Sequence, residues 1–288
     1  MDAVGRAEEF LQVNGRLLDR VRFDFHFRGG SAGRVIDALR PYQNADGGFG
    51  HALEPDLRGP ESQPVPVEVA LQVMDGLGAL DGGLLGGGLL GGSLKYLASI
   101  TRPDGGVPWV LPTTSPHGPW WVPAGGLPGS LNPTASIAGL LLKHGVSHPW
   151  VTSATEFCWA ALDDLTTPDA FDVLCILRFL ENVPDRQRAS AAWSPLSRFV
   201  TSIAELDPHA EGYVHGPLDF APLPGSLARS MFPADVISQH LDALAANQKE
   251  DGGWDFAFPA WTPITRFEWR GWVTVEALLT LHTNGRLR

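Results

Sequence analysis

Apolar residues recur at intervals of three and four along most of the chain, which is the spacing of one face of an α-helix. The clearest example is the segment 66–77. Five apolar residues share one face of it: Val67, Ala70, Leu71, Met74 and Leu77. Because no run of residues shows a convincing strand pattern, the sequence predicts an all-α fold of about ten to twelve helices.

Several other segments follow the same pattern. Helices are expected over residues 3–23, from Ser31 to the neighbourhood of Pro41, after Asn132, over a run from 148 to 205, over 235–246 and over 273–282. Residues 23–28 alternate apolar and polar side chains before two glycines, and we expect a loop there.

Glycine and proline divide these helices. Residues 82–92 are so rich in glycine that we expect a flexible connection, with Ser93 starting the next helix. Two long irregular loops are expected over 103–133 and 211–233, and a third loop is expected to hold Trp261, Trp269 and Trp272. No shift in composition marks a boundary, so residues 1–288 are expected to form a single domain.

One short turn sequence occurs three times. The first copy runs from Gln43 to Phe49 and the last from Gln248 to Trp254, each with a glutamine three residues before Asp-Gly-Gly and an aromatic residue after it. The middle copy, residues 101–109, keeps Asp-Gly-Gly but has Thr101 in place of the glutamine. Glycines permit positive φ, aspartate accepts backbone hydrogen bonds, and the aromatic side chain can anchor the turn. The glutamine amide can connect the end of one helix to the start of another.

The first and last copies resemble the Gln-Trp repeat of the terpenoid cyclase and protein prenyltransferase superfamily. The resemblance covers the three turns and their flanking helices, about half of the chain. It implies an (α/α)6-type toroid, in which inner helices surround an apolar cavity, and it places the loops after each turn near the mouth of that cavity.

Charge, cysteine content and apolar runs limit the partners and the location expected for the protein. The formal net charge of −11 argues against nucleic acid and anionic membranes as main partners. Cys158 and Cys175 form neither a disulfide framework nor a metal motif, and both are expected in the core. No apolar run is long enough to span a bilayer and no secretory signal pattern is seen, so a cytoplasmic location is expected. The sequence leaves the oligomeric state open.

The resemblance selects the polar and aromatic residues of the loops as candidate site residues. The candidate catalytic residues are His51, Glu54, Asp56, Asp255 and Glu268. The candidate substrate-binding residues are Arg58, His117, Trp120, Trp121, Arg266 and Trp269. A carboxylic acid kept neutral in an apolar pocket can protonate an alkene, and aromatic faces can stabilise the resulting carbocation. For each acid alone, a solvated charge or an ion pair that anchors a loop is the competing interpretation.

The chain also departs from the family. The Asp-x-Asp-Asp acid motif of triterpene cyclases is missing, and neither cysteine fits the zinc site of protein prenyltransferases. Asp163, Asp164, Asp169 and Asp172 are the nearest aspartate cluster, which could hold Mg²⁺ and a diphosphate or simply end one helix and cap the next. No metal site and no cofactor is expected, with Mg²⁺ as the alternative.

The first hypothesis is therefore a terpenoid cyclase-like lyase or isomerase that acts on a small isoprenoid or similar apolar substrate by acid-initiated cyclisation, isomerisation or elimination. A carbohydrate-active α/α-barrel lyase or hydrolase is the second, because paired acids and tryptophans suit that chemistry as well. A non-catalytic lipid-binding or scaffold protein is the third.

Overall fold

The computed structural model describes residues 2–80, 83 and 86–287. Within these residues it contains twelve α-helices, two short 3-10 helices and no β-strand, which confirms the all-α prediction. In chain order the helices are α1 (Ala3–Asn14), α2 (Leu17–Phe27), α3 (Ala32–Leu39), η1 (Arg40–Tyr42), α4 (Pro64–Gly76), α5 (Gly87–Ile100), α6 (Leu131–Lys143), α7 (Pro149–Asp163), α8 (Ala170–Asn182), α9 (Arg186–Ile203), α10 (Pro217–Phe220), η2 (Leu227–Met231), α11 (Ala234–Ala246) and α12 (Pro263–Thr283).

The chain divides into two compact units. Unit 1 combines Met1–Ala38 with Ser197–Arg288, and unit 2 is the continuous segment Leu39–Leu196. Unit 2 holds α4 to α8, whereas unit 1 holds α1, α2 and α10 to α12; α9 contributes to both. The expectation of a single domain stays a prediction.

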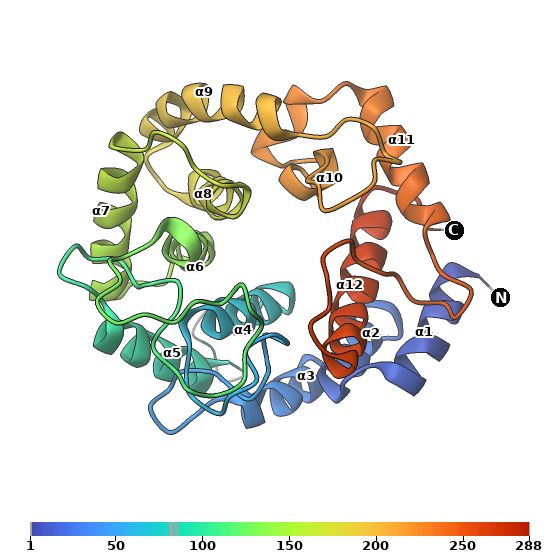
Figure 1. Ribbon diagram of the computed structural model, residues 1–288, viewed down its shortest axis with the longest axis horizontal. Coiled ribbons are helices and arrows are strands. Elements are labelled where there is room, and N and C mark those ends of the chain that lie inside the picture. The colour runs from blue at the N-terminus through green and yellow to red at the C-terminus, as the bar shows by residue number, and fades with distance from the viewer. Residues whose placement is uncertain (1, 81–82, 84–85, 288) are drawn as a thin grey trace. The chain divides into compact units, whose positions relative to one another are not determined.

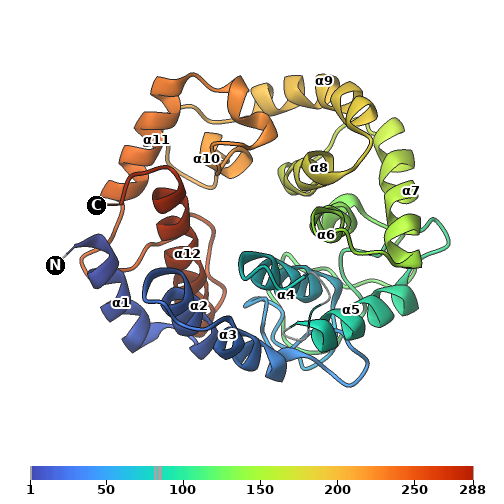
Figure 2. The same cartoon turned by 180° about the vertical axis from the view of Figure 1, so that it is seen from behind.

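In unit 2 the helices α4, α6 and α8 lie in one row, with α5 and α7 packed beside it (Figures 1 and 2). α4 and α6 run in the same direction. Near their starts Ser136 donates to Glu68 at 2.5 Å, and at their ends Lys143 and His144 contact Asp75 at 2.8 and 2.6 Å. The loops that precede α4 and α6 therefore meet at one end of the row.

The helices α6 and α8 approach each other closely. A Cβ atom at Gly139 of α6 would lie only 2.4 Å from the carbonyl oxygen of Arg178 in α8. Residues Pro133 to Leu141 of α6 are all buried. This contact fixes the position of Arg178 relative to α6.

Unit 1 is built around α12, which contacts α1, α2 and α11. Arg270 of α12 donates two hydrogen bonds of 2.7 Å to the carboxylate of Asp251, and its guanidinium lies 4.4 Å from the ring centre of Phe10 in α1. These bonds lower the pKa of Asp251. Arg270 thus connects the last repeated turn to α1 and α12.

All three copies of the repeated turn have the same hydrogen bonds. In the first copy Asn44 N–H donates to Gly48 O, Gly47 N–H donates to Asn44 O and Gly48 N–H donates to Asp46 Oδ1, each at 2.9 Å. The equivalent bonds are 2.8, 2.9 and 3.0 Å in the middle copy and 2.8, 2.9 and 3.1 Å in the last. The first glycine of each copy has a φ between 90° and 95°. The internal repeat predicted from the sequence is confirmed.

Glutamine connects two of these turns to a neighbouring helix, as predicted. Gln43 Nε2 donates to Leu89 O in α5 at 2.9 Å, and Gln248 Nε2 donates to Ala3 O in α1 at 2.8 Å. Each amide also donates to the carbonyl of the first glycine of its own turn, at 3.0 and 2.8 Å. The aromatic anchors Phe49 and Trp254 are both buried.

In the middle copy a threonine takes over this connection. Thr101 accepts a 2.9 Å hydrogen bond from the indole nitrogen of Trp150 at the start of α7. A Cβ atom at Gly105 would lie 3.1 Å from Ser153 O in the same helix. Each turn is therefore packed against an adjacent helix: α5, α7 or α1.

Two boundaries expected in the N-terminal part are wrong. Residues 3–23 form two helices instead of one, because the backbone at Gly15 is extended, with φ −75° and ψ 146°. α2 then continues through Phe27, so the expected loop over 23–28 is mostly helix. Helix α5 begins at Gly87 and not at Ser93, while Asp81 and residues 82, 84 and 85 of the expected connection lie outside the described residues.

The C-terminal part differs from the prediction in a similar way. Trp269 and Trp272 belong to helix α12, which begins at Pro263 after Thr262 accepts a 3.2 Å hydrogen bond from Thr265 N–H. The loop over 211–233 contains the short helices α10 and η2. The long loop before α6 has no helix, as expected.

Candidate functional site

Two loops of unit 2 that carry predicted site residues lie against each other. We call residues 50–62 the acidic loop and residues 107–130 the tryptophan loop. Arg58 N–H donates to Pro116 O at 3.1 Å, and Gly118 N–H donates to Asp56 O at 2.8 Å. Leu57 and His117 form an antiparallel bridge between the same segments. The two loops that contact each other carry seven predicted residues: His51, Glu54, Asp56, Arg58, His117, Trp120 and Trp121.

The acidic loop begins with two strained residues. His51 and Ala52 have φ angles of 57° and 60°, in the left-handed region that residues other than glycine seldom adopt. Hydrogen bonds hold this conformation: His51 N–H donates to Gly59 O at 2.8 Å, and its Nε2 pairs with Asn44 Oδ1 at 2.9 Å. Such strain costs on the order of 1–3 kcal/mol per residue and is concentrated at functional sites.

The acids of this loop are buried. Glu54 is 4% exposed and Asp56 is 2% exposed, although loops normally lie on the surface and acidic side chains are seldom fully buried. Both residues interact with other groups of the chain. Arg58 Nη1 donates to Pro55 O at 3.3 Å. The loop is thus a folded part of the interior that carries two carboxyl groups.

An aromatic cluster contains Leu57, the neighbour of Asp56 in the chain. Trp109 and Trp121 are stacked with ring centres 4.9 Å apart and planes 23° apart. Leu57 and Val110 pack in the same cluster as the buried Trp121. The indole N–H of Trp121 is buried and has no acceptor within the described residues. Trp120, by contrast, is exposed.

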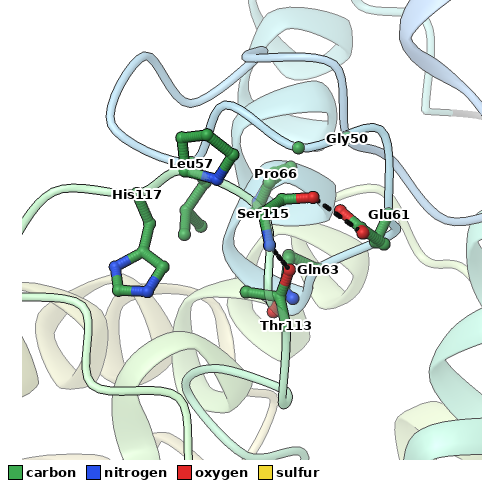
Figure 3. A pocket seen from close by; sticks show the side chains of 10 residues that line it. Gly50, Leu57, Glu61, Gln63, Pro66, Thr113, Ser115 and His117 are labelled. Atoms are coloured by element: carbon green, nitrogen blue, oxygen red, sulfur yellow. Dashed lines mark hydrogen bonds between the residues drawn. The ribbon is translucent and has the colours of Figure 1, made fainter.

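A small pocket lies between the two loops (Figure 3). Its volume is about 10 Å³, which is room for one water molecule. Ser115 donates to Glu61 Oε1 at 2.8 Å, and this hydrogen bond lowers the pKa of Glu61 (Figure 3). His117 lines the pocket, with Nδ1 3.0 Å from Gly118 O. A substrate does not fit here in this conformation.

A wider open groove is lined by the first repeated turn, the end of the acidic loop and helix α5. Its volume of about 540 Å³ is in the range of small-molecule sites. Asp46, Glu61 and Ser62 line it together with Tyr96 and Ile100 of α5. Tyr96 is buried, burial raises the pKa of its hydroxyl, and that hydroxyl has no partner within the described residues. The groove is therefore acidic and partly apolar.

The four remaining predicted site residues belong to unit 1. Asp255 and Arg266 form an ion pair of 2.6 Å, and Arg266 is mostly exposed. Trp269 packs edge-to-face on Phe258, with ring centres 5.3 Å apart. Glu268 is half-buried on α12 and has partners within the chain. For Asp255 the geometry matches the competing interpretation, an ion pair that anchors a loop.

The aspartate cluster is a helix end followed by a helix cap. Asp163 ends α7 and binds Arg188 at 2.8 Å, while Asp169 Oδ1 accepts from Asp172 N–H at 2.8 Å at the start of α8. Burial, with the nearby Asp169, raises the pKa of Asp172.

Across the described residues no three His, Cys, Asp or Glu side chains are arranged to hold a metal ion. Among the same residues we find no helix with the length and apolarity to cross a bilayer.

One polar cluster was not predicted. Glu68 of α4, Ser136 of α6 and Arg178 of α8 meet within the helix row of unit 2. Gln72 also donates to Glu68 Oε1, at 2.8 Å. The sequence offers one signal for this cluster, because Glu68 lies outside the apolar face of its helix. It does not identify the partners of Glu68, which are 68 and 110 residues away in the chain.

Unit 2 therefore holds two buried carboxyl groups and a stacked pair of tryptophans on two loops that contact each other. Asp56 and Glu54 supply the carboxyl groups, and Trp109 and Trp121 supply the rings.

No family model and no curated protein sequence matches the chain.

Proposed function

We propose that the protein is an enzyme that acts on an isoprenoid or similar apolar molecule, with Asp56 as the proton donor. The observation that carries the proposal is the burial of Asp56 and Glu54, at 2% and 4% exposure, in a loop whose Leu57 packs in one cluster with Trp121 of the stacked tryptophan pair. Burial favours the neutral form of a carboxylic acid, and only the neutral form can give a proton to an alkene.

Asp56 is 2% exposed and the pocket between the two loops holds only one water molecule, so the loops must separate before a substrate reaches this carboxyl group. The reaction would then begin when the Asp56 hydroxyl transfers its proton to one alkene carbon and leaves a carbocation on the other. The faces of Trp109 and Trp121 stabilise a cation through their negative quadrupoles. Loss of a proton from a neighbouring carbon ends the reaction as an isomerisation, and attack by a second alkene before that loss gives cyclisation. Glu54, two residues from Asp56 in the chain, is the second carboxyl group of the proposed site.

Membership of the terpenoid cyclase and prenyltransferase superfamily belongs to the same proposal. Its support is the shared hydrogen-bond pattern of the three turns and their packing against α5, α7 and α1. The toroid and its apolar chamber follow from that membership. Small-angle X-ray scattering on the protein in solution would measure its shape and test the toroid.

The wide groove favours a second candidate, a carbohydrate-active enzyme. Asp46 and Glu61 line the groove, and glycoside chemistry uses pairs of carboxyl groups. However, Asp46 Oδ1 already accepts from Gly48 N–H and from Ser62 Oγ, at 2.9 and 2.8 Å, so it has a structural role in the first turn. We therefore rank this candidate below the first.

A substrate screen separates the two. The purified protein is incubated with free terpenoid alkenes, prenyl diphosphates and oligosaccharides, each with and without Mg²⁺, and products are identified by mass spectrometry. Rearranged terpenoids are expected, and their formation is expected to stop in Asp56→Asn. Cleavage of oligosaccharides alone would support the second candidate, with its active site in the groove. Turnover of none of the three substrate classes would reject both candidates.

A further inference from the structure

Arg178 is fixed in the helix row of unit 2 by one of its nitrogens. Nη1 donates to Glu68 Oε1 at 3.0 Å and to the hydroxyl of Ser136. Glu68 is 8% exposed and Ser136 is fully buried. The guanidinium therefore has a rigid support on two neighbouring helices.

The opposite edge of the same guanidinium is open. The side chain of Arg178 is 35% exposed, and its Nε and Nη2 donate to no group of the described residues. Nε–H and Nη2–H point in parallel and are spaced to match the two oxygens of a carboxylate. Because Nη1 is already fixed, the ordering cost of binding such a ligand is reduced.

Apolar residues continue from this edge along α8. Leu174 precedes Arg178 by four residues and Phe171 precedes Leu174 by three, so the three side chains lie on one face of the helix. Phe171 is 46% exposed and Leu174 is half-buried. A ligand with its head at Arg178 can therefore place an apolar chain on these residues.

The charge of the cluster selects the head group. Glu68 faces Nη1 and carries the charge that compensates Arg178, so the cluster as a whole is close to neutral. A ligand with one negative charge gains two charge-assisted hydrogen bonds at the open edge. A dianion, such as a phosphate monoester, brings a second negative charge that no group of this cluster compensates. The carboxylate of Glu68 repels this second charge and so weakens binding of the dianion.

The geometry points to a binding site for the carboxylate of an apolar acid, with Arg178 as its ligand and Glu68 and Ser136 as the residues that position Arg178. The apolar part of the ligand lies along Leu174 and Phe171. This site does not depend on the proposed reaction, because neither Asp56 nor Glu54 takes part in it. It adds a class of ligand, aliphatic or isoprenoid carboxylates, to what unit 2 can bind.

Isothermal titration of the full-length protein at pH 7.5 tests the site. The probes are octanoate, octyl phosphate and octan-1-ol, which share one chain and differ only in the head group. Octanoate is expected to bind at least about tenfold more tightly than either of the others, since tenfold corresponds to about one charge-assisted hydrogen bond. Equal affinity for the three probes, or no binding of octanoate, would overturn the site.

Arg178→Lys keeps the positive charge but removes the parallel pair of donors. Octanoate affinity is expected to fall at least about tenfold in this variant, and octan-1-ol affinity to stay unchanged. Arg188→Lys is the matched control, because Arg188 lies on α9 of the same unit and is bound to Asp163 instead, and it is expected to bind octanoate like wild type. Wild-type affinity in Arg178→Lys would reject the assignment. Should that variant fail to fold, the comparison of the three probes on wild type decides alone.

Discussion

Replacing Gly252 by alanine tests whether the last turn is packed against α1 as the structure has it. Gly252 has a φ of 90°, and a Cβ atom there would lie 2.1 Å from the carbonyl oxygen of Arg6. The left-handed backbone alone costs an alanine about 1–2 kcal/mol. Because the clashing atom is helix backbone, α1 or the turn must also move.

That movement has a cost that the structure allows us to work out. It breaks the hydrogen bond from Gln248 to Ala3 O, which contributes about 1 kcal/mol, and it loosens the packing of Phe10 against Gly253. We therefore expect Gly252→Ala to lower the free energy of unfolding by at least about 2–3 kcal/mol.

A second glycine of unit 1 provides the control for this experiment. Gly285 also has a positive φ, of 68°, but no atom lies within 4 Å of the position of a Cβ there. Gly285→Ala should cost only the backbone term, about 1–2 kcal/mol. Both variants are compared with wild type by urea unfolding, followed by circular dichroism. Equal losses of stability in the two variants would refute the reasoning, because the contact with α1 would then contribute nothing.

Two further predictions concern unit 1. Trp254→Ala removes a buried side chain and its 2.7 Å hydrogen bond to Leu244 O, and it should cost on the order of 3–5 kcal/mol; an unchanged melting temperature would contradict this. Burial, with a contribution from Arg22, lowers the pKa of His26 from 6.5 to about 4. Since the unfolded state then takes up the proton first, wild type should lose stability as the pH falls from 6.5 to about 4, and His26→Gln should lose less. Identical pH profiles for the two proteins would count against the shifted pKa.

Local chemistry made the turns predictable from sequence. Positive φ at glycine, the aspartate cap and the double donor of the glutamine amide all act within a few residues, so Gln43 and Gln248 could be assigned their roles without a structure. The same holds for the end of α7 at Asp163 and for the cap of α8 at Asp169. The sequence could only suggest the burial of Asp56, and it did not single out Trp109, which stacks on Trp121.

Tertiary packing decided where prediction failed. Helix α5 contains a glycine-rich stretch that propensity assigns to a loop. Gly92 is nevertheless needed there, because a Cβ atom at this position would lie 2.7 Å from Gln43 Nε2 and 3.2 Å from Gly47 Cα of the first turn. The start of α12 was predicted wrongly because Trp269 and Trp272 were assigned to a loop, and the capping pair Thr262 and Thr265 was therefore not recognised. The contact of Glu68 with Arg178 spans 110 residues, and no local pattern encodes it.

The most direct test of the proposed function is the turnover of Asp56→Asn on the terpenoid that the screen identifies. The variant should lose at least about 100-fold in kcat, as expected for removal of a general acid, and should keep the melting temperature of wild type within a few degrees. Asp164→Asn, at the exposed end of α7 in the same unit, is the control and should retain full activity. Wild-type turnover in Asp56→Asn would contradict the account, because the buried carboxyl would then not be the source of the proton.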